Sequence, residues 1–311
     1  MGRLLGAEPV RWGNFGQVLF LSSTAGDFAL RGAPHWPWQF REEKLLVDLL
    51  HERTQAPVPW PYLVDDDPTI FGWPYVLMPR LPGLAVEDPE VAAILSPDDR
   101  RNIAWALGDT LAEMQELTWL LPGAYDPQIG EVAPLGEDFG GWVAGRIRRS
   151  LEAARRHTPH YTTAADAAWV EDVLHGVGTA LREPLVPRFT MQDYKYQNAG
   201  VERVQGGWRI SGVFDIGGWF GDGEAALSRQ VAMYLETDPT GDLARAFIGA
   251  YLSRRSARPG FGERFAAYML DERLGIWEWA QREHMVWWDP RLSLREWVEP
   301  FATAAQRLQL V

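Results

Sequence analysis

A change in hydrophobic pattern near residue 80 constrains the fold of this chain more than any other feature. Two short apolar runs at 17–21 and 27–31 flank a turn-forming segment, which is typical of a β-hairpin. Apolar residues at helical spacing predict a helix over 39–53, and the run 73–78 predicts another strand. We therefore expect residues 1–80 to form a small unit that mixes strands and a helix.

The pattern after this unit is helical. Residues 79–83 read Pro-Arg-Leu-Pro-Gly, a stiff connector that we interpret as a hinge. Ser96 followed by Pro97 is typical of a helix start, because serine caps a helix and proline is tolerated at its first position. Further helices are expected at about 137–157, 164–181, 224–236, 242–255 and 261–287. A β element over about 188–215 interrupts them.

The composition excludes several classes of protein. The 311 residues contain no cysteine, which removes disulfide scaffolds, thiolate zinc sites and a cysteine nucleophile, and which fits a cytoplasmic location. No apolar run approaches the roughly 18 residues of a membrane span, and no signal-peptide core is present. The net charge of −12 disfavours nucleic acid as a partner and would suit a cationic small molecule. The oligomeric state stays open.

The β element carries two oxygen ligands that a hairpin would bring together. Gly206-Gly207 between two β-prone runs predicts a two-residue loop. In that register Asn198 faces Asp215 at the open end of the ribbon, where opposed Cβ atoms are roughly 4.5–5.5 Å apart. An amide oxygen and a carboxylate at that spacing can share a hard cation such as Mg²⁺. A longer loop, or a bulge at Gly200 or Gly212, would shift this register.

Asp193 and Lys195 lie on the turn that enters the hairpin. A carboxylate there could face the same cavity, orient a hydroxyl group and accept its proton as it attacks. Lys195 and Lys44 are the only lysines among 30 basic residues, and Lys195 would supply a mobile positive charge. The structural alternative is an aspartate in a loop, an asparagine at a strand end and an aspartate at a turn, all of which are common.

The order of these residues resembles the catalytic segment of protein-kinase-like phosphotransferases, and more closely the aminoglycoside phosphotransferase family. Asp-x-Lys-x-x-Asn at 193–198 precedes a short hairpin and Asp-x-Gly at 215–217. Other segments resemble the family in order, from about residue 10 to 235. They are 27–31, Arg41-Glu42 on the early helix, 75–83, 111–115 and 221–224. The last seventy-five residues match no motif.

The resemblance implies a protein-kinase-like fold of class α+β with two lobes. Residues 1–80 would form a small, β-rich, nucleotide-binding lobe that ends in a hinge at about 77–83. Residues 84–311 would form a larger, mainly helical C-terminal lobe. This second lobe would hold the catalytic loop 191–198, the metal-binding turn 213–217 and the helices that bind the acceptor.

The resemblance also implies a small-molecule kinase. It would transfer the γ-phosphoryl group of ATP or GTP to a hydroxyl of an aminoglycoside-, macrolide- or sugar-like acceptor. Asp193 would be the catalytic base, Lys195 could reach the transferring phosphoryl group, and Asn198 with Asp215 would hold Mg²⁺. Arg31 would contact the nucleotide phosphates, and Glu42 would hold Arg31 in place. The backbone of Leu77, Met78 and Pro79 would contact the nucleotide base, and the loop 13–16 would cover the phosphates.

Two departures from the family pattern leave an alternative open. The usual His-Gly-Asp reads Met191-Gln192-Asp193, so the histidine that braces the catalytic loop is missing. The phosphate-binding lysine is replaced by Arg31, whose guanidinium is larger and forked. The alternative function is therefore a nucleotide-binding pseudokinase with a regulatory or scaffolding role.

Two clusters outside the motifs allow a structural and a functional interpretation. The tryptophans of the C-terminal stretch are expected in the core, or as the wall of an acceptor pocket. They are Trp277, Trp279, Trp287, Trp288 and Trp297. A run of arginines is expected on a solvated helix face, or in contact with substrate. It comprises Arg146, Arg148, Arg149, Arg155 and Arg156. His157 and His160 predict a surface pair in preference to a metal site.

Overall fold

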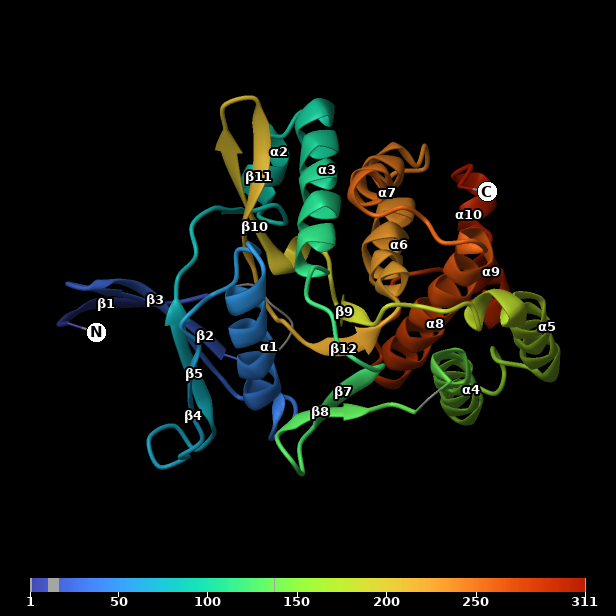
Figure 1. Cartoon of the computed structure of the whole chain (residues 1–311), viewed down its shortest axis with the longest axis horizontal. Helices are drawn as coiled ribbons and strands as arrows, with labels where there is room; N and C mark the ends of the chain where they lie inside the picture. The colour runs from blue at the N-terminus through green and yellow to red at the C-terminus, as the bar shows by residue number, and fades with distance from the viewer. Residues whose placement is uncertain (1, 11–16, 137, 311) are drawn as a thin grey trace.

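The computed structural model describes residues 2–10, 17–136 and 138–310 and has a two-lobed α+β fold (Figure 1). The predicted loop 13–16 lies outside the described residues. The N-terminal lobe is an antiparallel sheet of order β1-β2-β3-β5-β4 with one helix beside it. Its elements are β1 (Leu4–Pro9), β2 (Gln17–Ser23), β3 (Gly26–Gly32), α1 (Gln39–Arg53), β4 (Leu63–Asp65) and β5 (Tyr75–Pro79).

The C-terminal lobe is mainly helical (Figure 1). Its helices are α2 (Pro89–Ile94), α3 (Pro97–Met114), α4 (Phe139–His157), α5 (Ala164–Leu181), α6 (Leu227–Thr237), α7 (Asp242–Arg254), α8 (Phe261–Arg282), α9 (Leu294–Ala302) and α10 (Ala304–Arg307). Its strands are β6 (Leu84–Ala85), β7 (Gly123–Asp126), β8 (Glu131–Pro134), β9 (Arg188–Met191), β10 (Ala199–Val204), β11 (Gly207–Val213) and β12 (Gly218–Gly221). They form two small sheets, β11-β10-β6 and β8-β7-β12-β9. Among the described residues, no helix is long and apolar enough to cross a membrane.

Side-chain caps define where several helices begin. Ser96 accepts from the backbone N–H of Asp99, whose carboxylate accepts from the Ser96 N–H in return, so α3 begins at Pro97 as expected. The start of α6 differs from the predicted position near 224. Residues 223–226 form a 3₁₀ turn capped by Asp222, and the α-helix begins only at Leu227.

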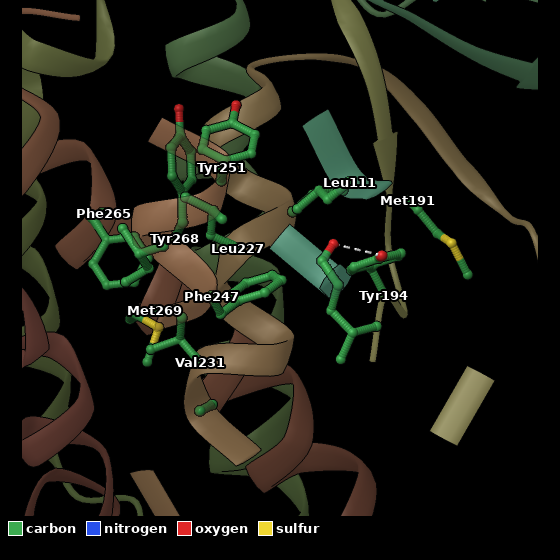
Figure 2. Packing of buried hydrophobic residues seen from close by; sticks show 14 of the residues in the cluster. Leu111, Met191, Tyr194, Leu227, Val231, Phe247, Tyr251, Phe265, Tyr268 and Met269 are labelled. Atoms are coloured by element: carbon green, nitrogen blue, oxygen red, sulfur yellow. Dashed lines mark hydrogen bonds between the residues drawn. The ribbon is translucent and has the colours of Figure 1, made fainter. Parts of the chain in front are cut away.

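Tyr194 anchors the segment that carries Asp193 and Lys195 to the core of the C-terminal lobe. Its ring is fully buried, and its centroid lies 6.3 Å from that of Phe247 on α7. Its hydroxyl donates to the carbonyl oxygen of Leu107 in α3 at 2.8 Å (Figure 2). Asp193 and Lys195, on either side of Tyr194, are therefore anchored to the core of the C-terminal lobe.

The hairpin register differs from the predicted one. Val204 pairs with Gly207, so the loop is Gln205-Gly206 and not Gly206-Gly207. The ladder then shifts between Gly200 and Val201, a bulge that partly reverses the change. The Asn198 carbonyl consequently accepts from the Phe214 N–H at 2.8 Å, and the prediction that Asn198 faces Asp215 directly is wrong. The two-residue slip arises because glycine at 207 takes its place in the strand.

Candidate active site

A cavity of about 760 Å³ is lined by residues of both lobes, a size that suits a small-molecule ligand. Arg31 on β3 reaches it from the N-terminal sheet, with Met78 and Pro79 at the end of β5. The C-terminal lobe contributes Asp193, Lys195, Asn198 and Asp215 to the same cavity, together with Arg229, Ile276 and Trp279. Most of the predicted site residues therefore meet in one place, although the first and last of them, Arg31 and Asp215, are 184 positions apart.

The Asp193 carboxylate is held by three side chains. Its Oδ2 accepts from Lys195 Nζ at 2.7 Å and from Asn198 Nδ2 at 3.1 Å. Its Oδ1 accepts from Arg229 Nε at 2.9 Å. The Asp193 side chain is 37% exposed, so the carboxylate is fixed in direction and still open to the cavity. An oriented carboxylate of this kind can accept a proton from a bound hydroxyl group.

The amide of Asn198 is oriented by the same aspartate. Its Nδ2 donates to the Asp193 carbonyl at 2.9 Å as well as to the carboxylate. Because the nitrogen is used in this way, the amide oxygen is the atom left to bind a cation. Asp215 follows β11 with φ of 59°, a left-handed conformation in which aspartate is enriched among non-glycine residues.

The donor set fits Mg²⁺. An asparagine oxygen and a carboxylate are hard ligands, and Mg²⁺ commonly takes one or two protein ligands and completes its shell with phosphates and water. Among the described residues, no group of three or more histidine, aspartate, glutamate or cysteine side chains is placed to hold a metal. This chain could therefore hold Mg²⁺ with Asn198 and Asp215 in a shared site, but not in an all-protein cage.

Arg31 pairs with Glu43, and the predicted pairing with Glu42 is wrong. Arg31 Nη1 lies 2.8 Å from Glu43 Oε2 and Nη2 lies 2.5 Å from Asp215 Oδ1. Glu42 instead accepts from the Gly218 N–H at 3.3 Å. Glu42 and Glu43 are adjacent on α1, and 100° of helical rotation separates their side chains. Only the Glu43 side chain points toward β3. This depends on how α1 is rotated about its axis, which a sequence motif does not reveal.

Glu43 sits in a buried network that fixes Arg31. Burial raises the pKa of Glu43 to about 6, although Arg31 opposes the rise. Tyr62 and Gln39 also donate to the Glu43 carboxylate. Burial by itself would lower the pKa of Arg31, but Glu43 and Asp215 outweigh it and raise that pKa. The guanidinium therefore stays charged where it lines the cavity.

The predicted base-binding segment is only partly in the cavity. Met78 and Pro79 line it, as do residues 80–83 that follow. Leu77 is buried and pairs with Leu30 of β3 and Leu63 of β4, and it is not among the residues that line the cavity. Neighbouring side chains of a β-strand point to opposite faces of the sheet, so Met78 can face the cavity while Leu77 faces away from it.

The residues that depart from the family pattern have structural partners. Met191 is fully buried on β9 and pairs with Gly218 of β12, and the Gln192 N–H donates to the Gly217 carbonyl at 3.0 Å. Gln115 ends the segment 111–115 that resembles the family. Its amide donates to the Gly223 carbonyl and accepts from the Tyr251 hydroxyl, both at 2.8 Å. It thereby ties α3 to the segment that follows β12.

Sequence reasoning missed Arg229 on α6 and Glu272 on α8. Arg229 Nη1 lies 2.8 Å from Glu272 Oε1 while its Nε contacts Asp193. Both residues lie outside the motifs and are separated by 43 positions. The only signal in the sequence was the position of Arg229 in the first turn of the helix that follows the Asp215 turn.

Trp277 and Trp297 belong to the core, and Trp288 packs against them. Trp288 stacks on Trp297 at 4.0 Å and on Trp277 at 5.2 Å. Trp279 is the member of the set that lines the cavity. Several members of the arginine run form ion pairs away from the cavity. The pairs are Arg146 with Asp271, Arg148 with Glu171 and Arg156 with Glu152. His157 pairs with Glu278 at 3.2 Å.

Comparison with known proteins identifies the family. A model of the phosphotransferase enzyme family matches residues 6–220. The chain belongs to the phosphotransferase enzyme family. The match contains the segments that carry Arg31, Asp193, Asn198 and Asp215, and the resemblance to aminoglycoside phosphotransferases is confirmed. The protein is therefore a phosphotransferase of the small-molecule kinase type. A search of curated proteins finds no match.

Solved structures of similar fold cover nearly the whole phosphotransferase chain. Aminoglycoside phosphotransferase APH(4)-Ia, with AMP-PNP and hygromycin B, is 13% identical with a TM-score of 0.66, over 99% of this chain and 95% of that one. A protein from Haemophilus somnus 129PT assigned as a fructosamine-3-kinase is 11% identical with a TM-score of 0.64, over 97% and 92%. A protein from Ralstonia eutropha JMP134 assigned as an aminoglycoside phosphotransferase is 15% identical with a TM-score of 0.61, over 100% and 94%.

Proposed function

We propose that this protein transfers the γ-phosphoryl group of ATP or GTP to a hydroxyl of an aminoglycoside-, macrolide- or sugar-like acceptor. The observation that carries the proposal is the convergence of an oriented carboxylate, two cation ligands and a buried arginine on one cavity. Phosphoryl transfer depends mainly on positioning and on neutralising negative charge, and these residue types supply both.

Asp193 is the proposed base. The acceptor hydroxyl oxygen forms a bond to the γ-phosphorus, the bond from that phosphorus to the β–γ bridging oxygen breaks, and the hydroxyl proton passes to the Asp193 carboxylate. Lys195, 2.7 Å from Asp193, is placed to follow the transferring group with its mobile ammonium. Asp193 and Lys195 are thus the residues that we assign to the chemical step.

Arg31 is the proposed contact for the nucleotide phosphates, with Glu43 in the holding role first given to Glu42. Asn198 and Asp215 would hold Mg²⁺, which would neutralise phosphate charge when bound. We place the lobe boundary in the hinge 77–83, between β5 and β6, with residues 1–80 and 84–311 on either side. The hinge segment from Met78 onward would face the nucleotide base.

The acceptor is proposed to lie against α8. Ile276 and Trp279 line the cavity from this helix, and a tryptophan can stack on the apolar face of a sugar ring. Glu87 and Asp88 also line the cavity and favour an acceptor that carries amines. Similar folds have been solved with hygromycin B and with kanamycin, together with AMP-PNP and with GDP respectively, which supports this acceptor class and both nucleotides.

A pseudokinase remains the second candidate, because Arg31 Nη2 occupies Asp215 Oδ1 at 2.5 Å. If Arg31 keeps this position, Asp215 cannot present that oxygen to a cation. The pseudokinase would bind a nucleotide, and it would produce no phosphorylated product from any acceptor.

The deciding experiment measures product formation with Mg-ATP and Mg-GTP over aminoglycosides, macrolides and sugar alcohols, detected by mass spectrometry. Asp193→Ala is the control variant and should lose turnover by at least about a hundredfold while it still binds the nucleotide. Equal turnover by Asp193→Ala would remove Asp193 from the mechanism. Nucleotide-dependent thermal stabilisation without product over the whole panel would favour the pseudokinase.

A further inference from the structure

Arg229 links the proposed base to the helix that forms the acceptor side of the cavity. Its Nε donates to Asp193 Oδ1 at 2.9 Å and its Nη1 to Glu272 Oε1 at 2.8 Å. The Arg229 side chain is 18% exposed and lines the cavity. One guanidinium therefore spans from α6 to the catalytic loop on one side and to α8 on the other.

We propose that Arg229 is a positioning residue that sets the orientation of the Asp193 carboxylate, with Glu272 holding Arg229 in place. This inference rests on the proposed function, because it takes Asp193 as the base. The planar fork of arginine suits the role, since two of its nitrogens can donate to two different carboxylates in a fixed geometry.

The two oxygens of Asp193 are not equivalent. Oδ2 accepts from Lys195 and from Asn198, so its acceptor capacity is largely used. Oδ1 accepts only from Arg229 among the described residues. Oδ1 therefore keeps a lone pair for a substrate hydroxyl, and Arg229 decides where that lone pair points. Without Arg229, only the contacts of Lys195 and Asn198 at Oδ2 would restrain the χ2 torsion of Asp193, which is broad for aspartate, and Oδ1 would lose its partner.

The catalytic loop needs such a brace. Met191 is apolar and fully buried, so it cannot donate a hydrogen bond to the loop as a histidine could. Gln230, which is next to Arg229 on α6, also holds this loop. Its side-chain oxygen accepts from the Tyr196 N–H at 2.6 Å. The N-terminal half of α6 thus holds both Asp193 and the backbone that follows Lys195.

The connection to α8 gives the brace a second consequence. Glu272, Ile276 and Trp279 follow one another at spacings of four and three residues, which places them on one face of the helix. Ile276 and Trp279 line the cavity, and Glu272 holds Arg229. One face of α8 therefore lines the side of the cavity that would meet the acceptor. The same face, through Glu272 and Arg229, holds the proposed base.

The test compares Arg229→Gln, Arg229→Lys and Glu272→Gln with the wild type in steady-state kinetics with the acceptor found by the panel. Arg229→Gln should lower kcat by about tenfold to a hundredfold, because a misplaced catalytic group costs a rate factor of this size. The Kd for Mg-nucleotide should change less than about threefold. Arg229→Lys should lose less kcat than Arg229→Gln, because lysine keeps the positive charge. It should still lose some kcat, because lysine cannot donate to both carboxylates as the arginine fork does.

Glu236→Gln is the matched control. Glu236 joins the same two helices through Arg273 of α8, at 2.6 Å, and Arg273 also lies 3.3 Å from Glu272, but Glu236 and Arg273 form no hydrogen bond or ion pair with Asp193 or Lys195. This variant should keep wild-type kcat even if it melts at a lower temperature. The double variant Arg229→Gln with Glu272→Gln should be no slower than Arg229→Gln alone, because Glu272 acts through Arg229.

Chemical rescue supplies a readout that a purely structural role would not change. Arg229→Ala should regain a measurable part of its lost kcat in millimolar guanidinium, whereas Asp193→Ala should not. If the wild type transfers phosphate and Arg229→Gln, shown to be folded by its melting curve, keeps kcat within about twofold, the positioning role is wrong while the proposed function stands. A kcat loss in Glu236→Gln equal to that in Arg229→Gln would also overturn the role. A wild type without product from any acceptor would overturn the proposed function itself.

Discussion

Arg31 Nη2 lies 2.5 Å from Asp215 Oδ1, although the two residues are 184 positions apart. Arg31 belongs to the N-terminal sheet and Asp215 follows the hairpin of the C-terminal lobe. Both residues line the cavity, and the pair joins the proposed phosphate contact to a proposed cation ligand. Nucleotide binding with Mg²⁺ should therefore exchange this ion pair for contacts to phosphate and metal.

Asp215→Asn is expected to abolish the Mg²⁺ dependence of nucleotide binding, because it removes the charged ligand of the site. Isothermal titration with ATP, with and without Mg²⁺, measures the effect. Asp66→Asn is the matched control, since Asp66 also pairs with an arginine and its side chain has the same 41% exposure. Unchanged Mg²⁺ dependence in Asp215→Asn would exclude Asp215 as a ligand.

Glu43→Gln should weaken nucleotide binding by roughly tenfold, because Arg31 loses its buried charged partner. Glu42→Gln should change the affinity by less than about threefold, since Glu42 contacts only the Gly218 N–H among its described polar neighbours. The two variants differ by one position on the same helix, so equal effects would show that the holding role is not specific to Glu43.

The stability of the protein should carry a pH dependence that comes from Glu43. The pKa of Glu43 is raised in the folded state, to about 6 from a usual 4.5, mainly by burial. The folded state therefore binds a proton more tightly than the unfolded state, and the contribution of Glu43 to stability falls as pH rises from 4.5 to 6. The expected loss is about 2 kcal/mol.

Urea unfolding of the wild type and Glu43→Gln at several pH values isolates this contribution. The difference in unfolding free energy between them should shift in favour of the variant by about 2 kcal/mol in total between about pH 3.5 and about pH 7, with most of the change between pH 4.5 and pH 6, and then level off. A difference that stays constant over this range would mean that Glu43 titrates normally in the folded protein.

Lys195→Arg should impair transfer more than its conservative character suggests. The Lys195 ammonium lies 2.7 Å from Asp193 Oδ2 in a side chain that is 15% exposed, a space that suits a compact cation better than a planar fork. We expect kcat to fall by about tenfold. Lys44→Arg, which changes the only other lysine, at the surface beside Asp48, should have no effect. Unchanged turnover in Lys195→Arg would remove Lys195 from the chemical step.

Trp279→Ala should raise the KM for the acceptor by about tenfold and leave the KM for the nucleotide unchanged. Trp279 lines the cavity, and a stacked aromatic side chain contributes a few kcal/mol at most to binding a ring. Trp287→Ala is the control, because Trp287 is 53% exposed and belongs to the tryptophan cluster outside the cavity. If Trp279→Ala raised the KM for the nucleotide, Trp279 would contact the nucleotide, and its proposed place beside the acceptor would be wrong.

The sequence by itself determined the change from strands to helices near residue 80, the family resemblance and most of the residues that meet in the cavity. These follow from local patterns: the change from strand to helical periodicity near residue 80, and the ordered spacing of Asp193, Lys195, Asn198 and Asp215. The length of chain between motif residues limits how far apart they can lie, so residues a few positions apart, such as Asp193 and Asn198, stay in one neighbourhood whatever surrounds them.

Only the tertiary structure decided which side chains hold these residues. The choice of Glu43 over Glu42 depends on how α1 is rotated against β3, and the shift of Asn198 from Asp215 to Phe214 depends on a glycine joining a strand. Arg229 reaches Asp193, and Glu272 reaches Arg229, through the packing of α6 against α8. Such contacts arise from the relative placement of whole elements, and residues distant in sequence carry no local signal of it.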